Sequence, residues 1–384
     1  MNNAYLFIIW LLMLLSAIVR NEPAPYDILL TGCFAVGLAT SVLRYRKYLF
    51  APFFLLSLFL LTNLISLAFS TDFVRGLAYL GLTAYLVMSW GFFVGFFGRF
   101  GGKGVEGVLT GWVMAATVST AITSLVAVGF PIAAQWFVWG EGRAVGLFKD
   151  PNVFGAFLVP PALYAIIKSD QCDRAQRILW LFVSLALAIG IVLSLSRGAW
   201  ANYLITMAVF LLMSRKFTLQ GRISSALKVM LLIAVVLIYV VSQSDFNAVL
   251  AQRVSLQAYD EERFLTQAMA LQAGLINPLG IGPGQSEVVF QYATHNLYLR
   301  LFSENGWGGF FFFVSFVTMT AFRAFRGARV NTSLQQHECI LIFSALCGAL
   351  VNSLFIDSLH WRHLWVLLAL PWFPLGQGCA GNRR

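Results

Sequence analysis

The stretch DEERFLTQAMALQAGLINP (Asp260–Pro278) leads into the turn GIGPG (Gly280–Gly284) and then into HNLYLRLFSENGWGG (His295–Gly309). Together with the polar segment that begins at Gln243, these residues form the one long polar part of an otherwise apolar chain. They carry arginine, histidine and carboxylate side chains between strongly apolar runs. Ionisable residues kept next to a membrane mark functional sites. We therefore expect residues 243–294 to form a catalytic loop between two spanning helices.

The rest of the chain is strongly apolar. Hydrophobic residues make up 59% of its 384 residues and charged residues only 11%, where a soluble domain has about 25% charged residues. The mean hydropathy is +0.78, and runs of about 20 apolar residues, enough to span a bilayer, recur along the chain. This composition predicts an all-α polytopic membrane protein with one integral membrane domain over residues 1–384. The first run, Tyr5–Val19, lacks a basic start and a small-residue cleavage site, so we expect a spanning helix there and not a signal peptide.

The apolar runs predict about twelve transmembrane helices, with the larger loop between the ninth and the tenth. The predicted helices are Tyr5–Val19, Tyr26–Leu43, Tyr48–Phe69, Leu77–Phe97, Val108–Phe130, Asn152–Ile167, Ile178–Leu195, Gly198–Met213, Val229–Val241, His295–Phe322, Cys339–Ile356 and Leu364–Leu375.

The basic residues predict how these helices are oriented. On this helix assignment, 17 of the 26 basic residues fall on one side of the membrane. They are Arg44, Arg46, Lys47, Arg99, Lys103, Lys168, Arg174, Arg177, Arg215, Lys216, Arg222, Lys228, Arg323, Arg326, Arg329, Arg383 and Arg384. Because lysine and arginine are enriched in cytoplasmic loops, we expect both termini in the cytoplasm and residues 243–294 outside. This bias also accounts for the net charge of +10 without a nucleic-acid partner.

Arg197 is one of the few basic residues on the outer side. It lies in SLSRGAW (Ser194–Trp200), between two apolar runs so close that they predict a tight re-entering pair of helices. A charge at membrane depth is costly unless it is paired or hydrated. Two interpretations stay open: Arg197 faces an anion in a water-filled cavity, or it extends to the lipid headgroups.

Arg263 follows the acidic run Asp260–Glu262, which is typical of a helix N-terminus. Gly274 and Pro278 predict the end of that helix. Arg263 could bind a ligand on the polar face of the helix. It could equally form an intrahelical salt bridge, which is worth only tenths of a kcal/mol.

His295 lies at the start of an apolar run, so we expect it to cap a helix. A helix N-terminus disfavours imidazolium, which predicts a neutral ring able to accept a proton. A lone histidine at a cap is more often structural, so both roles stay open. Glu304 points to the opposite helix face at about 100° per residue and is not expected to orient His295. His360 and His363, near Asp357, form a weaker alternative as metal ligands.

Four motifs in this order resemble the O-antigen ligase family, whose superfamily also holds Wzy-type polysaccharide polymerases. They are GLFKDPNVFGAFL (Gly146–Leu158), SLSRGAW (Ser194–Trp200), ERFLTQAMAL with NPLGIGPG (Glu262–Gly284) and HNLYLRLFSENGWGG (His295–Gly309). The resemblance covers residues 146–309, and the number of predicted helices fits it.

The resemblance implies a membrane glycosyltransferase. It would move a glycan from undecaprenyl diphosphate to an acceptor sugar, either on a lipid A-core or on a growing polysaccharide, at the periplasmic face of a bacterial inner membrane. The reaction would be inverting, metal-independent and free of cofactors. By that likeness Arg197 and Arg263 hold the diphosphate and His295 is the catalytic base. Asp150 and Asn152 match a motif for which two roles stay open, sugar binding and helix capping. The implied partners are the lipid-linked donor, the glycan or lipid-core acceptor and membrane lipids.

These residue types suit that chemistry. Arginine binds phosphate oxygens in bidentate fashion without a metal, and a neutral histidine can accept the proton of a sugar hydroxyl. The acidic run beside Arg263 is the one acidic cluster of the predicted outer loops, and it has no paired-aspartate spacing for Mg²⁺.

Three alternatives stay open. A Wzy-type polymerase fits the same motifs as a ligase. A transporter or flippase for lipid-linked oligosaccharides belongs to another class, and Pro160 and Pro161 could break a spanning helix as transporters do. Against it, the acidic residues fall at helix ends and in loops, so no carboxylate relay is predicted inside the membrane. A non-catalytic partner of an export system is the third alternative.

Overall fold

The structure, a computed structural model, describes residues 2–127, 136–139, 142–214, 258–330 and 336–374. The predicted helix Val229–Val241 and residues 243–257 of the predicted catalytic loop lie outside the described residues.

The described chain is almost entirely α-helical, which confirms the prediction of an all-α polytopic membrane protein. Among the described residues, five helices are long and apolar enough to cross a membrane. They are Lys47–Leu67, Phe73–Val126, Pro151–Gln171, Arg174–Leu193 and Gly306–Arg329. The shorter apolar helices are Asn3–Leu15, Pro25–Ala39, Arg197–Met213 and Gln336–Asn352.

The helices follow the predicted order along the chain. The first part comprises α1 (Asn2–Leu15), α2 (Pro25–Ala39), η1 (Lys47–Leu49), α3 (Phe50–Leu67), α4 (Phe73–Ala127), the two-stranded hairpin β1 (Val138–Trp139) and β2 (Arg143–Ala144), α5 (Pro151–Gln171), α6 (Arg174–Leu193) and α7 (Arg197–Met213). The second part comprises α10 (Ala258–Ile276), α11 (Ser286–Val289), α12 (Leu297–Glu304), α13 (Gly306–Val330), α14 (Gln336–Asn352), α15 (Arg362–Ala369) and η4 (Leu370–Trp372).

Helix α4 contains two of the predicted helices in one element. The predicted helices Leu77–Phe97 and Val108–Phe130 join without a loop, and the chain leaves helical geometry at Gly101, where φ is 54° and ψ is −135°. A side chain would strain this left-handed backbone, whereas glycine adopts it readily. The helix therefore kinks at Gly101.

The predicted single helix His295–Phe322 is wrong, because the structure divides it into α12 and α13. The break lies at Asn305 and Gly306, and Gly306 has a φ of 67°. A Cβ atom at Gly306 would lie 2.2 Å from the carbonyl oxygen of Pro278. The break therefore depends on a distant segment that packs against it, and hydropathy along the chain does not reveal that contact.

Helix α10 starts close to its predicted position but passes its first predicted stop. It continues through Gly274 and ends at Ile276, before Pro278. A Cβ atom at Gly274 would lie 2.3 Å from the ring of Phe302. Gly274 therefore serves the close packing of α10 against α12 and does not end the helix.

Helix α5 runs unbroken through Pro160 and Pro161. Proline lacks the N–H that would bond the carbonyl four residues earlier, which for Pro161 is the carbonyl of Phe157. Instead, the indole of Trp112 in α4 donates to that oxygen at 3.1 Å. A neighbouring helix thus replaces the lost hydrogen bond, and the proline pair does not produce the broken helix of a transporter.

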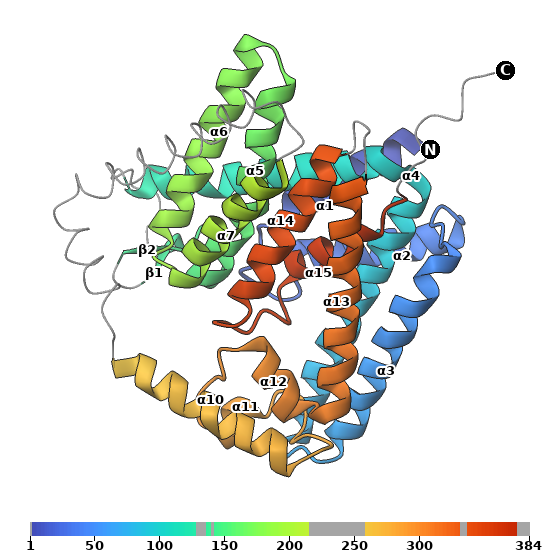
Figure 1. The fold of residues 1–384 in the computed structure, drawn as a ribbon, viewed down its shortest axis with the longest axis vertical. Coiled ribbons are helices and arrows are strands. Elements are labelled where there is room, and N and C mark those ends of the chain that lie inside the picture. Colours follow the sequence, from blue (N-terminus) through green and yellow to red (C-terminus); the bar gives the residue numbers. More distant parts are fainter. Residues whose placement is uncertain (1, 128–135, 140–141, 215–257, 331–335, 375–384) are drawn as a thin grey trace.

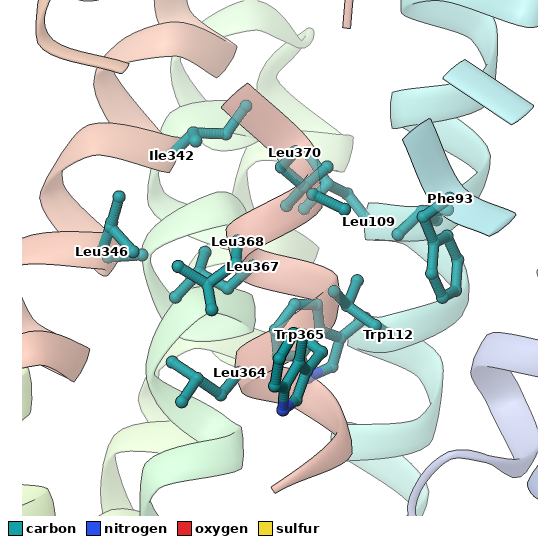
Figure 2. Packing of buried hydrophobic residues seen from close by; sticks show 14 of the residues in the cluster. Phe93, Leu109, Trp112, Ile342, Leu346, Leu364, Trp365, Leu367, Leu368 and Leu370 are labelled. Atoms are coloured by element: carbon teal, nitrogen blue, oxygen red, sulfur yellow. The ribbon is translucent and has the colours of Figure 1, made fainter. Parts of the chain in front are cut away.

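The short helix α15 lies inside the bundle. Its residues Leu364–Ala369 are all buried, and Figure 2 shows Trp365 and Leu368 among apolar side chains of α4 and α14. The loop that leads into α15 is therefore fixed from within the core.

The two ends of the bundle differ in their elements and in their basic residues. Figure 1 shows α10, α11 and α12 together at one end, and the α5–α6 connection at the other. At the end remote from α10, Arg323 stacks on the ring of Tyr48, 4.4 Å from its centroid, and donates to the carbonyl of Pro371. Lys168 pairs with Glu106 at 3.1 Å. The basic clusters at residues 44–47, 168–177 and 323–329 thus lie at the end opposite α10–α12.

Candidate active site

The loop formed by residues 353–361, between α14 and α15, joins the parts of the candidate site. The N–H of Leu297, at the start of α12, donates to the carbonyl of Ser353 at 2.9 Å. On another side, Asn352 comes so close to Gly198 of α7 that a Cβ atom there would lie 2.5 Å from its Oδ1. The end of α14 therefore lies against the beginning of α7, and the loop that follows it lies against the beginning of α12.

Arg197 is the first residue of α7. The turn before it is as tight as predicted, since α6 ends at Leu193, and Leu195 takes a left-handed backbone with φ of 49°. Ser196 caps α7 by accepting the N–H of Ala199 at 3.2 Å. The side chain of Arg197 is half-buried, and its neighbour Gly198 lies against Asn352.

Arg263 extends from α10 to the 353–361 loop. Its guanidinium Nη2 donates to the carbonyl of Phe355, and the residue remains partly accessible. A helix separated from the loop by many residues in sequence is thus positioned so that its arginine lies at the candidate site.

His295 lies beside Arg263, but it does not cap α12. The cap is Asn296, whose Oδ1 accepts the N–H groups of Tyr298 and Leu299 at 3.0 Å each. His295 precedes it with a left-handed backbone, φ 48°, and is half-buried next to the ring of Tyr292. The prediction that His295 is the cap is therefore wrong, because the amide side chain of Asn296 takes the free N–H groups.

The surroundings of His295 keep its ring neutral. Burial, and then the positive charge of Arg263, hold the pKa of His295 below its usual value of 6.5, while Asp357, Asp150 and Glu287 act in the opposite direction. The structure therefore gives a different cause for the neutral ring than the predicted helix N-terminus. It also places Arg263 and Asp150 within electrostatic reach of His295.

Asp150 and Asn152 hold the start of α5. Asp150 Oδ1 accepts the N–H of Asn152 at 2.6 Å and so caps the helix. The Oδ1 atom of Asn152 accepts from Arg143 Nη2 at 3.2 Å, and Arg143 also donates to the carbonyl of Ser194 at 3.3 Å. Arg143 thereby ties the Asp150 motif to the turn that carries Arg197.

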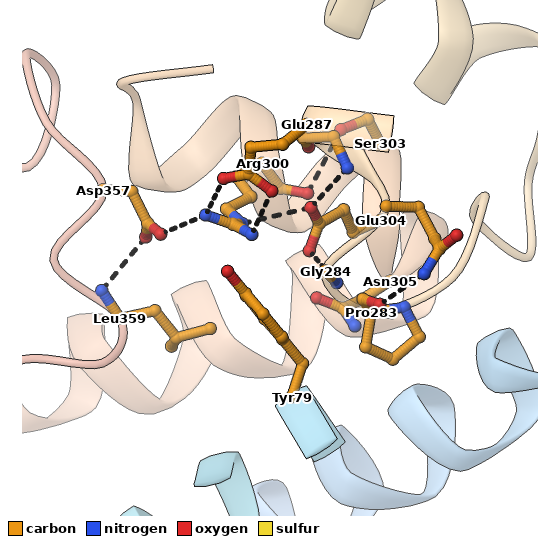
Figure 3. A network of polar contacts seen from close by, with 12 residues as sticks. Tyr79, Pro283, Gly284, Glu287, Arg300, Ser303, Glu304, Asn305, Asp357 and Leu359 are labelled. Atoms are coloured by element: carbon orange, nitrogen blue, oxygen red, sulfur yellow. Dashed lines mark hydrogen bonds and ion pairs between the residues drawn. The ribbon is translucent and has the colours of Figure 1, made fainter. Parts of the chain in front are cut away.

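A second polar cluster surrounds Arg300 of α12 (Figure 3). This side chain is only 4% exposed, and its guanidinium lies 2.6 Å from Asp357, 3.2 Å from Glu287 and 3.1 Å from Glu304. The Tyr79 ring lies 5.0 Å from the guanidinium carbon. Although burial opposes it, the carboxylates raise the pKa of Arg300 above its usual value, so the arginine is charged and its charge is compensated.

Comparison with known protein families bears on this geometry. Residues 182–314 match the sequence model of a family described as O-antigen ligase. The resemblance to the O-antigen ligase family is confirmed. No curated protein matches the chain. The match indicates O-antigen ligase activity or the related polymerase activity, in a membrane-bound protein.

The matched region contains Arg197, Arg263, His295 and Arg300, whereas Asp150 lies before it. It ends in the first part of α13, so the 353–361 loop, which contacts α10 and α12, also lies outside the match.

Two of the motifs that resemble the O-antigen ligase family interlock. The N–H groups of Ile281 and Gly282, in the GIGPG turn, donate to the carbonyls of Ser303 and Glu304 at 2.9 and 3.1 Å. The carboxylate of Glu304 accepts from the N–H groups of Gly284 and Ser286 at 2.8 and 3.0 Å (Figure 3). Gly280, Gly282 and Gly284 of this turn have positive φ. Glu304 holds the turn as well as Arg300.

The other two histidines lie in different surroundings. His360 Nε2 lies 3.0 Å from the Thr83 hydroxyl, and His363 packs against the rings of Phe157 and Trp361. Within the described ranges, no group of three or more histidine, cysteine or acidic residues could hold a metal ion.

The sequence predicts no role in the site for Arg143, Arg300 or the 353–361 loop, and it indicates Asp357 only beside possible metal ligands. Their roles depend on partners that are remote in sequence, and spacing along one helix does not reveal such partners.

Proposed function

We propose that this protein is a membrane glycosyltransferase that moves a glycan from undecaprenyl diphosphate to an acceptor sugar. The observation that carries the proposal is the half-buried His295 within electrostatic range of Arg263, which contacts the 353–361 loop. Asn352, just before that loop, lies against Gly198 next to Arg197. The family match over residues 182–314 supports the reaction class.

In the proposed reaction the acceptor hydroxyl attacks the anomeric carbon of the donor sugar. A carbon–oxygen bond forms there as the bond to the diphosphate oxygen breaks, with inversion at that carbon. The electron pair of the broken bond stays on undecaprenyl diphosphate. Because this leaving group gains negative charge, cationic groups near its oxygens lower the barrier.

Arg197 and Arg263 would bind that diphosphate. A guanidinium presents two parallel N–H donors to phosphate oxygens and carries its charge at every relevant pH. Both side chains are half-buried, and partial removal from water strengthens such contacts relative to those of a fully exposed arginine.

His295 would remove the proton of the acceptor hydroxyl. Its ring is neutral because burial and Arg263 lower its pKa, so it can accept a proton at neutral pH. Asp357, Asp150 and Glu287 act on the ring with the opposite sign. Their negative charge would stabilise the imidazolium that forms when the proton arrives.

The site lies at the end of the bundle with α10–α12, opposite the basic clusters. Because basic clusters prefer the cytoplasmic side, we propose that the reaction takes place on the periplasmic face of a bacterial inner membrane.

Transfer by the purified protein is the direct test. The full chain in detergent, given an undecaprenyl-diphosphate-linked glycan and an acceptor glycan, should form the joined product without added metal. Absence of product with both a lipid-core acceptor and an oligosaccharide acceptor would contradict the proposal. Product with the lipid core would identify a ligase, whereas lengthening of the oligosaccharide would identify a polymerase.

A further inference from the structure

A cavity of about 170 Å³ opens between the α1–α2 connection, the segment before α5 and the end of the 353–361 loop. Its lining includes Glu22, Lys149, Asp150, His360, Trp361 and Arg362. Pockets for drug-sized ligands measure about 300–1,000 Å³, so this one suits a single small ring and not a glycan chain.

The basic side chains around the cavity are paired with carboxylates. Lys149 Nζ lies 3.4 Å from a carboxylate oxygen of Glu22. Nε and Nη2 of Arg362 each donate to one carboxylate oxygen of Asp27 at 2.7 Å. Burial lowers the pKa of His360 to about 4, so its ring adds no charge at neutral pH. A lining of this kind does not select an anion such as a diphosphate, in contrast to the region of Arg197 and Arg263.

The same lining offers what an uncharged sugar needs. Asp150 uses Oδ1 to cap α5, and within the described part of the chain its Oδ2 makes no hydrogen bond. Carboxylates accept hydroxyl hydrogens, and Lys149 can donate to hydroxyl oxygens. The ring of Trp361 adds a large flat apolar surface. Aromatic surface with a few polar groups is typical of a small-molecule site.

The cavity lies within electrostatic range of the candidate base, because Asp150 in its lining is one of the charges that act on His295.

We propose that this cavity binds one uncharged sugar unit of a substrate glycan, with Asp150 and Trp361 as its main contacts. The proposal rests on the proposed function, because that function supplies the glycan. The sugar could belong to the acceptor or to the donor, and the two sources give different kinetic results.

Kinetics of Asp150→Asn give the main test. Asparagine is also a good helix cap, so this variant keeps the start of α5 and removes the charge that would bind hydroxyls. Loss of a charge-assisted hydrogen bond should raise one KM by about tenfold or more, with kcat changed less. A higher KM for the acceptor assigns the cavity to the acceptor sugar, and a higher KM for the donor assigns it to the donor sugar.

Asp173→Asn is the matched control, because Asp173 caps α6 in the same way at the other end of the bundle. Its KM values should stay within about twofold of the wild type, as expected for a surface substitution. Trp361→Ala should resemble Asp150→Asn, and Trp361→Phe should recover most of the affinity. If both KM values stay within twofold in Asp150→Asn and Trp361→Ala, the cavity is not a sugar site.

Binding without turnover separates this inference from the proposed function. Saturation-transfer NMR on the detergent-solubilised full chain can use glucose, galactose, mannose and glucuronic acid as probes. We expect signals from at least one neutral hexose, loss of those signals in Asp150→Asn and their retention in Asp173→Asn. Such binding in a protein without transferase activity would leave the cavity assignment intact and contradict the proposed function. Turnover with normal KM values and no hexose signal would contradict the cavity assignment alone.

Discussion

Arg300 and Arg263 both contact the 353–361 loop but lie in opposite surroundings. Arg300 is buried among three carboxylates that compensate its charge, and one of them is Asp357. Arg263 is partly accessible, donates to the carbonyl of Phe355 and acts through its positive charge on His295, which Asp357 also influences. Depth of burial, and not the residue type, therefore separates an arginine that organises a fold from one that can meet a substrate anion.

Contacts next to the Arg300 cluster also hold the segment from α11 to α13 against α3 and α4. Arg75 at the start of α4 pairs with Glu287 at 2.9 Å and donates to the carbonyl of Gly284 at 2.7 Å. Asn305 donates to Asn63 of α3 at 2.7 Å. The segment from α11 to α13 is thereby fastened to the ends of α3 and α4, which keeps His295 in position.

The largest effect should follow from loss of the base. A general base contributes about 10²–10⁴-fold, so His295→Ala should lower kcat by that factor while donor binding stays near normal. Steady-state turnover and donor binding of the purified variant would measure both. His295→Gln, which keeps a polar side chain, should be equally inactive. Turnover above about a tenth of the wild-type rate in either variant would remove His295 from the chemistry.

Removal of Arg300 would test whether this buried arginine stabilises the fold. Arg300→Ala leaves its carboxylates buried together, and breaking a buried pair costs about 3–5 kcal/mol. The free energy of unfolding, measured by denaturant titration in detergent, should fall by that amount.

Arg75→Ala is the matched control for Arg300→Ala. Arg75 also pairs with Glu287, but its side chain is 35% exposed, and exposed pairs contribute about 0–1 kcal/mol. Equal losses in the two variants would show that burial does not distinguish the two arginines.

Lysine in place of Arg197 or Arg263 would test whether these arginines bind the diphosphate. Lysine keeps the charge and loses the planar pair of donors. Because a charge-assisted hydrogen bond is worth about 1.5–3 kcal/mol, kcat/KM should fall by roughly one to two orders of magnitude. Near-normal kcat/KM in both variants, at normal expression, would make these arginines structural or lipid-facing.

The pH dependence of kcat/KM should sharpen the role of Arg263. The base is active when deprotonated, and its pKa lies below 6.5, so the rate should fall as the pH falls below that value. Arg263→Gln removes a charge that lowers the pKa, which should move this acid limb to higher pH. If the acid limb of the pH profile lies at the same pH in Arg263→Gln and the wild type, Arg263 does not act on the pKa of His295.

The smallest perturbation concerns the sides of the membrane. Single cysteines at Glu261 on α10 and at Gln171 at the end of α5 occupy exposed positions at opposite ends of the bundle. A membrane-impermeant thiol reagent on intact cells should label Glu261→Cys and spare Gln171→Cys. The reverse pattern would place the candidate site in the cytoplasm and contradict the proposed mechanism.

Several elements could be predicted because their causes are local. The apolar runs predicted α3, α5, α6 and α7 close to their observed bounds, since a spanning helix bonds its own backbone and needs only length and hydropathy. The break at Gly306 could not be predicted in this way. It depends on the carbonyl of Pro278 and on the turn that follows it, which pack there only after the chain has folded.

Composition and motif spacing are properties of the chain alone, so they were enough to predict the class of the protein, its family resemblance and the residue types available for chemistry. Tertiary structure decided which of those residues meet. It placed Arg263 at Phe355, Asn296 and not His295 at the helix cap, and Arg300 among carboxylates. The physical reason is that the burial and charge environment of a side chain come from neighbours that are distant in sequence, and these set its pKa and its role.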